Sequence, residues 1–161
     1  MSTHPKLARV AEAAQRAGLE ISVRRFPEGT RTAEDAARAI GCDVAQIVKS
    51  LVFMADEEPV MALLSGADRL DPGRLAAATA AAGVRRATGD EARAATGFAI
   101  GGVPPFGHDG DLTVLVDRGL LAQDPVWAAA GLPDAVFSIS PDDLLRVSGG
   151  RVEDLAAVRG G

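Results

Sequence analysis

Lys49 stands out as a candidate for chemistry because it is a lone ammonium in an apolar run. Only two of the 17 basic residues in this 161-residue chain are lysines, so arginine carries positive charge almost everywhere else. Lys49 lies in IVKSLVFMA, residues 47–55, which has the composition of a strand. The period of two of a strand places it on one face with three apolar residues, Ile47, Leu51 and Phe53. An ammonium there is costly unless it meets an anion, a carbonyl or water. The position therefore predicts either a pocket or an edge from which the side chain reaches solvent.

The stretch TGFAIGGVPPFGH, residues 96–108, is the second candidate, and we call it the elbow. Its paired glycines, Gly101 and Gly102, have no Cβ and let backbone N–H groups approach a ligand closely. Pro104 and Pro105 then fix φ and remove two donors, which stiffens the turn. Such a loop can present amides to a carbonyl oxygen or a carboxylate, as an oxyanion hole does. The same composition is also typical of an ordinary turn between strands.

The remaining residues that could carry chemistry are isolated in the sequence. His108 is either a general base or a plain surface residue, and Cys42 has neither a neighbouring base nor a second cysteine to pair with. Two histidines and one cysteine disfavour a zinc site. Neither a Walker-type phosphate loop nor a G-x-S-x-G elbow is present.

The elements that must position these residues are a mixture of strands and helices. Helices are predicted at 5–17, 32–41, 71–83, 90–95 and from 141, with a helical turn at 43–46; strands are predicted at 21–26, 47–55, 59–65, 84–87, 97–100, 111–117, 135–140 and 151–153. The strands at 47–55 and 59–65 are expected to form an antiparallel hairpin. This pattern favours an α+β fold in one domain over residues 1–161.

Composition limits the possible partners. The formal net charge of −5 argues against a protein whose whole surface binds nucleic acid through counterion release. Local basic groups, Arg24, Arg25 and Arg31 or Arg85 and Arg86, are either phosphate contacts or solvated surface charges. No apolar run is long enough to span a membrane, and the first residues lack the apolar core of a secretory signal. We expect a cytoplasmic protein with no membrane contact.

The run IVKSLVF and the elbow, with the helix between them and the later strand TVLVD, resemble the YbaK family of aminoacyl-tRNA deacylases. This family is related to the editing domain inserted in bacterial prolyl-tRNA synthetases. The resemblance spans about Leu7 to Leu155. It implies a small α+β domain with a mixed, largely antiparallel, barrel-like sheet flanked by helices. It also implies trans-editing: hydrolysis of the ester of mischarged tRNA, mostly tRNA(Pro) carrying a small wrong amino acid such as Ala, Cys or Ser, without metal or cofactor.

The resemblance also assigns residues. The family's essential lysine falls on Lys49, and its G-x-x-x-P loop falls on Gly101 to Pro105. Lys49 is expected to bind the terminal phosphate or the ester carbonyl, while the Gly101 and Gly102 amides hold the aminoacyl group. The substrate's own 2′-hydroxyl is expected to activate the attacking water. Further pocket residues are expected at Thr32, Asp117 and His108, with Ile47, Phe53 and Ile100 setting the pocket size.

The implied partner is the acceptor end of aminoacyl-tRNA, with hand-over from prolyl-tRNA synthetase or an elongation factor. Two alternatives stand beside this enzyme. One is a non-catalytic module of the same fold that binds a small molecule, a tRNA end or a protein. The other is an esterase of small metabolites, but the sequence shows no nucleophile for such an enzyme. The amino acid removed and the oligomeric state are left open.

Overall fold

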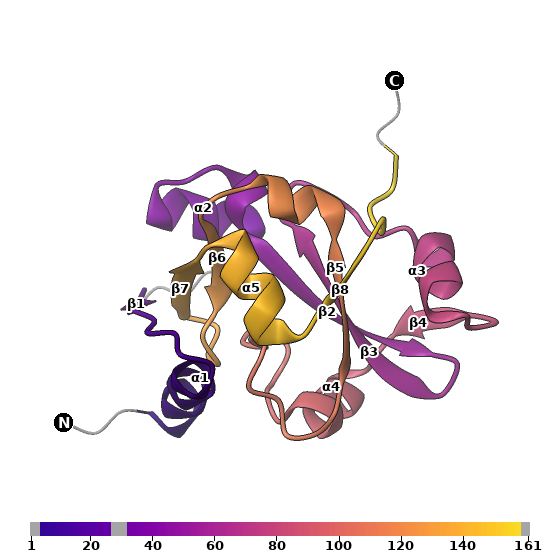
Figure 1. The fold of residues 1–161 in the computed structure, drawn as a ribbon, viewed down its shortest axis with the longest axis horizontal. Helices are drawn as coiled ribbons and strands as arrows, with labels where there is room; N and C mark the ends of the chain where they lie inside the picture. Colours follow the sequence, from indigo (N-terminus) through magenta and orange to yellow (C-terminus); the bar gives the residue numbers. More distant parts are fainter. Residues whose placement is uncertain (1–3, 27–31, 159–161) are drawn as a thin grey trace.

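The computed structural model describes residues 4–26 and 32–158, and within them the backbone forms five α-helices and eight strands in two sheets (Figure 1). The helices are α1 Pro5–Arg16, α2 Ala33–Ile40, α3 Pro72–Thr79, α4 Gly89–Thr96 and α5 Pro141–Ser148, with 3-10 turns η1 Val44–Gln46 and η2 Arg118–Ala122. The strands are β1 Val23–Arg25, β2 Val48–Ala55, β3 Glu58–Ser65, β4 Val84–Arg86, β5 Thr113–Asp117, β6 Val126–Ala129, β7 Ala135–Ile139 and β8 Arg151–Glu153.

The larger sheet has the order β4-β2-β3-β5-β8 and the smaller one β1-β7-β6. The predicted hairpin is confirmed: β2 and β3 pair antiparallel from Val48 opposite Ser65 to Ala55 opposite Glu58. β5 runs parallel to β3, and β8 runs parallel to β5. All pairs in the smaller sheet are antiparallel. The predicted α+β class with a mixed, largely antiparallel arrangement is therefore confirmed.

The barrel-like closure does not form among the described residues. A bridge between Ile47 and Trp127 links the two sheets. This isolated bridge does not extend into a ladder, and β4 pairs with β2 only over residues 53–55. The opposite end of β2 therefore keeps an open edge facing β6, where the two sheets meet without merging.

The two faces of β2 enter different cores, as the period of two predicted. Val48, Val52 and Met54 belong to the main core, which also receives side chains from α1, α4 and α5. Phe53 belongs to a second core under α3, with Leu51 packed against it. A smaller cluster joins α2 to Ile47 and Trp127. Lys49 therefore lies on a strand that is held by packing on both sides.

Capping groups fix α2 and α4, the two helices that flank the predicted site. The Thr32 hydroxyl accepts a hydrogen bond from the Asp35 N–H at 3.0 Å, and α2 ends at Gly41 with φ of 87°. α4 begins with a capping box formed by Thr88 and Glu91. Hydrogen bonds from Arg85 lower the pKa of the Glu91 carboxyl to about 2, so this carboxylate stays ionised far into the acid range. The helix that leads into the elbow is thus anchored at its start.

Three local predictions were wrong or incomplete. α3 ends at Thr79 instead of Gly83, because the Asp56 carboxylate accepts the Ala82 and Gly83 amides and turns the chain there. Residues 97–100 are not a strand. The Thr96 hydroxyl accepts the Phe98 N–H at 3.0 Å, and Gly97 ends α4 with φ of 85°. Strand β6 was not predicted.

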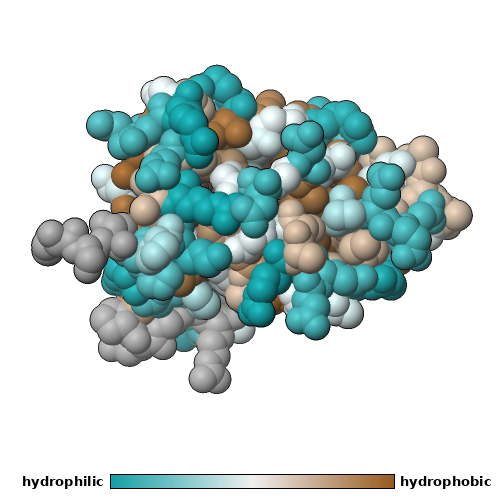
Figure 2. All heavy atoms as spheres, turned by 90° about the horizontal axis from the view of Figure 1, so that it is seen from below, coloured by the Kyte–Doolittle hydropathy of each residue, from teal (hydrophilic) through white to brown (hydrophobic). Residues whose placement is uncertain are grey.

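Hydrophilic side chains cover most of the face shown in Figure 2, with hydrophobic groups scattered between them. Of the large hydrophobic residues that the structure describes, two are exposed: Ile100, at 53%, and Val158, at 77%. Ile100 lies in the elbow, so an apolar side chain reaches solvent next to the predicted site. No described helix has the length and apolar composition that crossing a bilayer requires.

Candidate active site

A cavity of about 240 Å³ lies where the open edge of β2 faces β6 and β7. Four consecutive residues of β2, 48–51, line it. Because alternate side chains of a strand point to opposite faces, a cavity lined by four in a row meets the edge of the strand and its backbone. The predicted site residues that line this cavity are Thr32, Ile47, Lys49, Ile100 and Gly101.

Two larger hollows lie elsewhere on the described surface. One, of about 660 Å³, is lined by the acidic turn 56–58 together with residues of α3 and Arg151. The other, of about 390 Å³, runs beside His108 and the end of α5. Neither is lined by Lys49 or Gly101. The volume of a cavity therefore does not identify the candidate site. The site is identified by the cavity that both Lys49 and Gly101 line.

The Lys49 ammonium is partly buried and oriented by a backbone carbonyl. Its Nζ donates a hydrogen bond of 2.7 Å to the Asp68 carbonyl oxygen, in the segment between β3 and α3. An ammonium has three donors, and within the described residues its other donors have no partner. Of the two environments that the sequence allows for Lys49, the structure shows the pocket.

Gly101 and Gly102 have different environments although they are adjacent. Gly101 lines the cavity with φ of 98°, a conformation that favours glycine. Among the described residues its N–H has no hydrogen-bond partner. The Gly102 N–H donates to the Ala99 carbonyl at 3.0 Å. A Cβ on Gly102 would lie 2.9 Å from the Leu132 Cα. Gly101 can therefore offer an amide to a ligand, whereas the Gly102 amide is already used.

The other predicted residues lie outside the cavity lining. Gly102 and Pro105 are buried in the body of the elbow, and Phe53 is buried in the second core, with the Arg86 guanidinium 5.6 Å from its ring centroid. Asp117 is 3% exposed, and its carboxylate accepts the N–H groups of Gly119, Leu155 and Ala156. These contacts give Asp117 a structural role that joins β5 to the chain after β8.

His108 is also separate from the cavity. Its Nε2 lies 2.7 Å from the Pro104 carbonyl oxygen, and burial lowers the pKa of the imidazole below its usual range. The neutral ring therefore donates from Nε2, because a carbonyl can only accept. This contact ties the end of the elbow to its middle.

Of the other residues that line the cavity, Ser50, Arg86 and Trp127 carry polar or aromatic groups that were not predicted for the pocket. For Arg86 the sequence predicts only a phosphate contact or a solvated surface charge. The Ser50 hydroxyl oxygen is buried and has no hydrogen-bond partner among the described residues. Arg86 differs from its neighbour Arg85, which pairs with the Glu91 carboxylate at 2.7 Å. The pairing of β4 with β2, Arg86 opposite Phe53, brings Arg86 to the cavity. Two features of the sequence could have indicated these residues: the hydroxyl next to Lys49 and the Arg85–Arg86 pair. Which of the two arginines lines the cavity follows only from the register between β4 and β2.

The comparison with known families decides the identity. A model of the aminoacyl-tRNA editing domain matches residues 27–147. The chain belongs to this family. This match and the similar proteins described next confirm the predicted resemblance. Editing removes an amino acid from tRNA by hydrolysis of its ester, so this editing domain is a hydrolase, an aminoacyl-tRNA deacylase.

Individual relatives agree with this assignment. The editing domain is 43% identical to a proposed trans-editing enzyme for prolyl-tRNA synthetase of known crystal structure, with a TM-score of 0.91 over 98% of this chain and 100% of that one. It is 34% identical over 112 residues to the proline–tRNA ligase of Streptococcus thermophilus, which covers 70% of this chain but only 18% of the ligase. It is 29% identical over 133 residues to the uncharacterized protein YwhH of Bacillus subtilis, across 83% of this chain and 85% of that protein.

Proposed function

We propose that this editing domain hydrolyses, in trans, the ester of tRNA(Pro) that carries a small non-cognate amino acid such as Ala, Cys or Ser. The observation that carries the proposal is the shared cavity of Lys49 and Gly101. The likeness to proline–tRNA ligases and to a proposed trans-editing enzyme supports tRNA(Pro) as the substrate. Hand-over of that tRNA from prolyl-tRNA synthetase or an elongation factor belongs to the same proposal.

The chemistry needs donors more than it needs a nucleophile from the protein. An aminoacyl ester is already activated, so positioning and stabilisation of the developing oxyanion provide most of the catalysis. In this proposal the Lys49 ammonium lies beside the ester carbonyl or the terminal phosphate, and the Gly101 amide donates to the carbonyl oxygen. The Gly102 amide has no part in it, because Ala99 already accepts its hydrogen.

The hydrolytic step balances without a cofactor. A water molecule adds to the carbonyl carbon and gives one proton to the 2′-hydroxyl oxygen of the terminal ribose, which forms a tetrahedral oxyanion. The bond to the 3′-oxygen then breaks, and the 2′-hydroxyl passes its own proton to this leaving oxygen. The products are the free amino acid and deacylated tRNA. The Gly101 amide stabilises the negative charge on the oxyanion, which is greatest in the transition state, and Lys49 does the same if its ammonium lies beside the carbonyl.

Arg86 is the cation best placed for the phosphates of the acceptor end. It lines the cavity, and among the described residues no carboxylate pairs with it. Arginine binds phosphate through a planar set of donors. One such contact beside the cavity is compatible with the net charge of −5, since the domain need hold only the end of the tRNA.

The cavity walls favour a small amino acid. The large apolar residues around it are Ile47, Leu51, Ile100 and Trp127. Phe53 is buried elsewhere and does not line it. A hydrophobic pocket discriminates one methylene by about 1–3 kcal/mol. Excluding a larger side chain by steric contact is easier than rejecting a smaller one, so the cavity acts as a sieve that complements the synthetase.

The proposal is tested by deacylation of a panel of charged tRNAs by the wild-type protein. We expect turnover of one or more of Ala-, Cys- and Ser-tRNA(Pro), and none of Pro-tRNA(Pro). Equal rates on amino-acid esters that lack tRNA would favour a small-molecule esterase. Binding of these tRNAs without turnover of any of them would favour the non-catalytic module.

Ser50→Ala is expected to separate activity from stability. A buried hydroxyl without a partner costs about 1–3 kcal/mol, so its removal should leave Tm unchanged or raise it. If the hydroxyl bonds the substrate, kcat/KM should fall about 3- to 10-fold, the worth of one neutral hydrogen bond. Thermal unfolding and deacylation rates measure the two effects. Ser138→Ala, at an exposed position of β7, is the control. A Ser50→Ala variant with wild-type kinetics would show that the Ser50 hydroxyl does not bond the substrate.

A further inference from the structure

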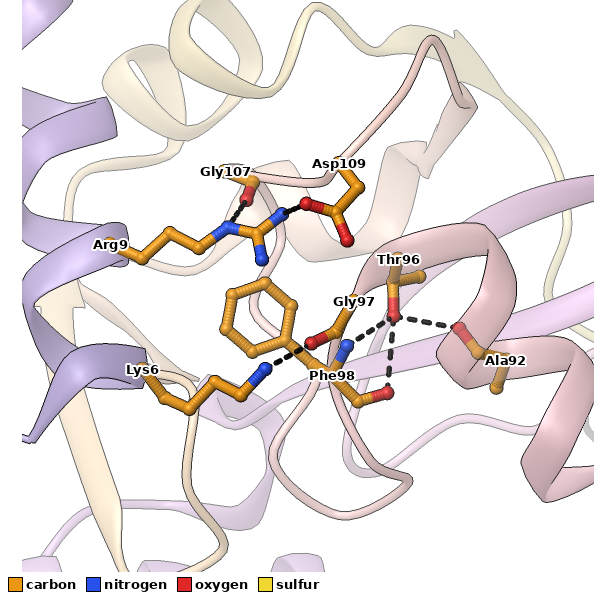
Figure 3. Close-up of polar contacts among 8 residues, drawn as sticks. All are labelled: Lys6, Arg9, Ala92, Thr96, Gly97, Phe98, Gly107 and Asp109. Carbon is orange, nitrogen blue, oxygen red and sulfur yellow. Dashed lines mark hydrogen bonds and ion pairs between the residues drawn. The ribbon is translucent and has the colours of Figure 1, made fainter.

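Two cations of α1 hold the two ends of the elbow (Figure 3). Lys6 Nζ donates to the Gly97 carbonyl oxygen at 2.6 Å, and Arg9 Nε donates to the Gly107 carbonyl oxygen at 3.1 Å. Arg9 also forms an ion pair with Asp109. Residues at i and i+3 lie on one face of a helix, so a single helix face binds the chain before and after the cavity-lining tip. We call Lys6 and Arg9 the α1 clamp.

Phe98 forms the centre of the clamp. Its ring is fully buried, and its centroid lies 5.2 Å from the Lys6 Nζ and 4.8 Å from the Arg9 guanidinium carbon. Cations placed over an aromatic ring are attracted to its face, more strongly when water is excluded. The first residue of the elbow after Gly97 is therefore fixed by the same two side chains that bind the carbonyls.

Glycines mark the points where the clamp and the elbow pack closely. A Cβ on Gly97 would lie 2.8 Å from an Arg9 guanidinium nitrogen, and one on Gly107 would lie 3.3 Å from the Ala13 Cβ. Gly131 follows β6, and a Cβ there would lie 2.8 Å from the Lys6 carbonyl oxygen. The next residue, Leu132, packs against Gly102. Backbone contacts thus run from α1 to the elbow without a flexible side chain between them.

We propose that the α1 clamp is a positioning element of the active site, which holds the Gly101 amide where the ester oxyanion develops. The family match begins at residue 27, so α1 lies outside it. The inference rests on the proposed function for its kinetic consequence, but the clamp itself concerns the conformation of the elbow. Lys6 and Arg9 act through the loop and do not line the cavity.

The expected effect of breaking the clamp is on kcat. An amide displaced from the oxyanion loses transition-state stabilisation, and a misplacement of about 1 Å can cost about 100-fold in rate. Lys6→Met and Arg9→Met are therefore expected to lower kcat about 10- to 100-fold while KM changes less than about 2-fold, because the Lys49 and Arg86 contacts persist. Lys6→Arg, which keeps a charged donor, should restore most of the activity.

The matched control is Arg146→Met. Arg146 also holds α1, through a 2.6 Å hydrogen bond from Nη1 to the Ala17 carbonyl oxygen, but at the end remote from the elbow. It should lower stability to a similar extent and leave kcat unchanged. Arg146→Met is compared with clamp variants that have the same Tm. If kcat falls equally in both, the loss of activity follows from general destabilisation and not from the elbow, and the proposal is wrong.

Hydrogen exchange gives a readout that does not depend on activity. The Phe98 and Gly102 amides are hydrogen-bonded within the elbow, and their exchange should accelerate in Lys6→Met and Arg9→Met but not in Arg146→Met. Unchanged exchange would overturn the clamp even if the wild type deacylates tRNA. Accelerated exchange in a protein that deacylates no tRNA would retain the clamp and reject the proposed function.

Discussion

Lys49→Ala is expected to lower kcat/KM for deacylation of mischarged tRNA(Pro) about 100- to 1,000-fold, the effect of removing one oxyanion donor. The cavity would keep its shape, but the ammonium that Asp68 orients would be gone. The loss should appear in both kcat and kcat/KM if Lys49 acts on the ester carbonyl. It should appear mainly in KM if Lys49 binds the terminal phosphate. Steady-state kinetics on one charged tRNA distinguish these roles.

Arg93→Ala provides the control for charge. Arg93 is an exposed cation on α4, and it does not line the cavity. Its removal changes the net charge by the same amount as Lys49→Ala and should leave the rate unchanged. Circular dichroism and Tm establish that both variants fold. A folded Lys49→Ala variant with activity within about 3-fold of wild type would contradict the oxyanion role, since one donor is worth far more than this.

Gly101→Ala is expected to abolish most of the activity for a backbone reason. The φ of 98° at Gly101 is strained for alanine, at a cost of about 1–3 kcal/mol. The space around it is sufficient, because a Cβ would approach Pro133 no closer than 3.8 Å. The chain can relieve this strain only by rotating the peptide, which turns the amide away from the cavity. We expect kcat to fall about 100-fold or more.

Gly149→Ala separates strain from function. Gly149 ends α5 with φ of 67°, and a Cβ there would meet nothing within 4 Å. Both substitutions place alanine at a positive φ, one at the candidate site and one far from it. The penalty is smaller at Gly149, because its φ lies in the left-handed region that L-residues can adopt. Folded variants in which activity is lost only in Gly101→Ala would support the role of the elbow amide. Retained activity in Gly101→Ala would show that another donor holds the oxyanion.

The sequence indicated the position of Lys49 beside a cavity better than it indicated which other residues line that cavity. The strand period correctly separated the faces of β2, because alternation is a local property of a strand. It also placed Phe53 on the same face as Lys49, but Phe53 does not line the cavity. β4 pairs with β2 at residue 53 and closes the edge before the cavity reaches that side chain. That pairing brings together residues about 30 apart in the chain, which periodicity does not encode.

The elbow shows the same limit. Gly101 and Gly102 have identical local chemistry, and the sequence treats them alike. Their environments differ because the 131–132 backbone packs against Gly102, whereas Gly101 lines the cavity. Asp117 was also predicted for the pocket, but backbone amides of residues 155 and 156 bind its carboxylate. In each case a partner distant in sequence determines the environment of the residue.

The open edge of β2 brings main-chain groups of residues 48–51 to one wall of the candidate site. Amide and carbonyl groups of the polypeptide are the same whatever side chains surround them, so amino-acid replacement does not erase what this wall presents to a substrate. Relatives that share only 29–43% of their residues with this chain can therefore preserve the shape and polarity of that surface while their side chains diverge. Selectivity among amino acids can then evolve by exchanging a few projecting groups around an unchanged polypeptide frame.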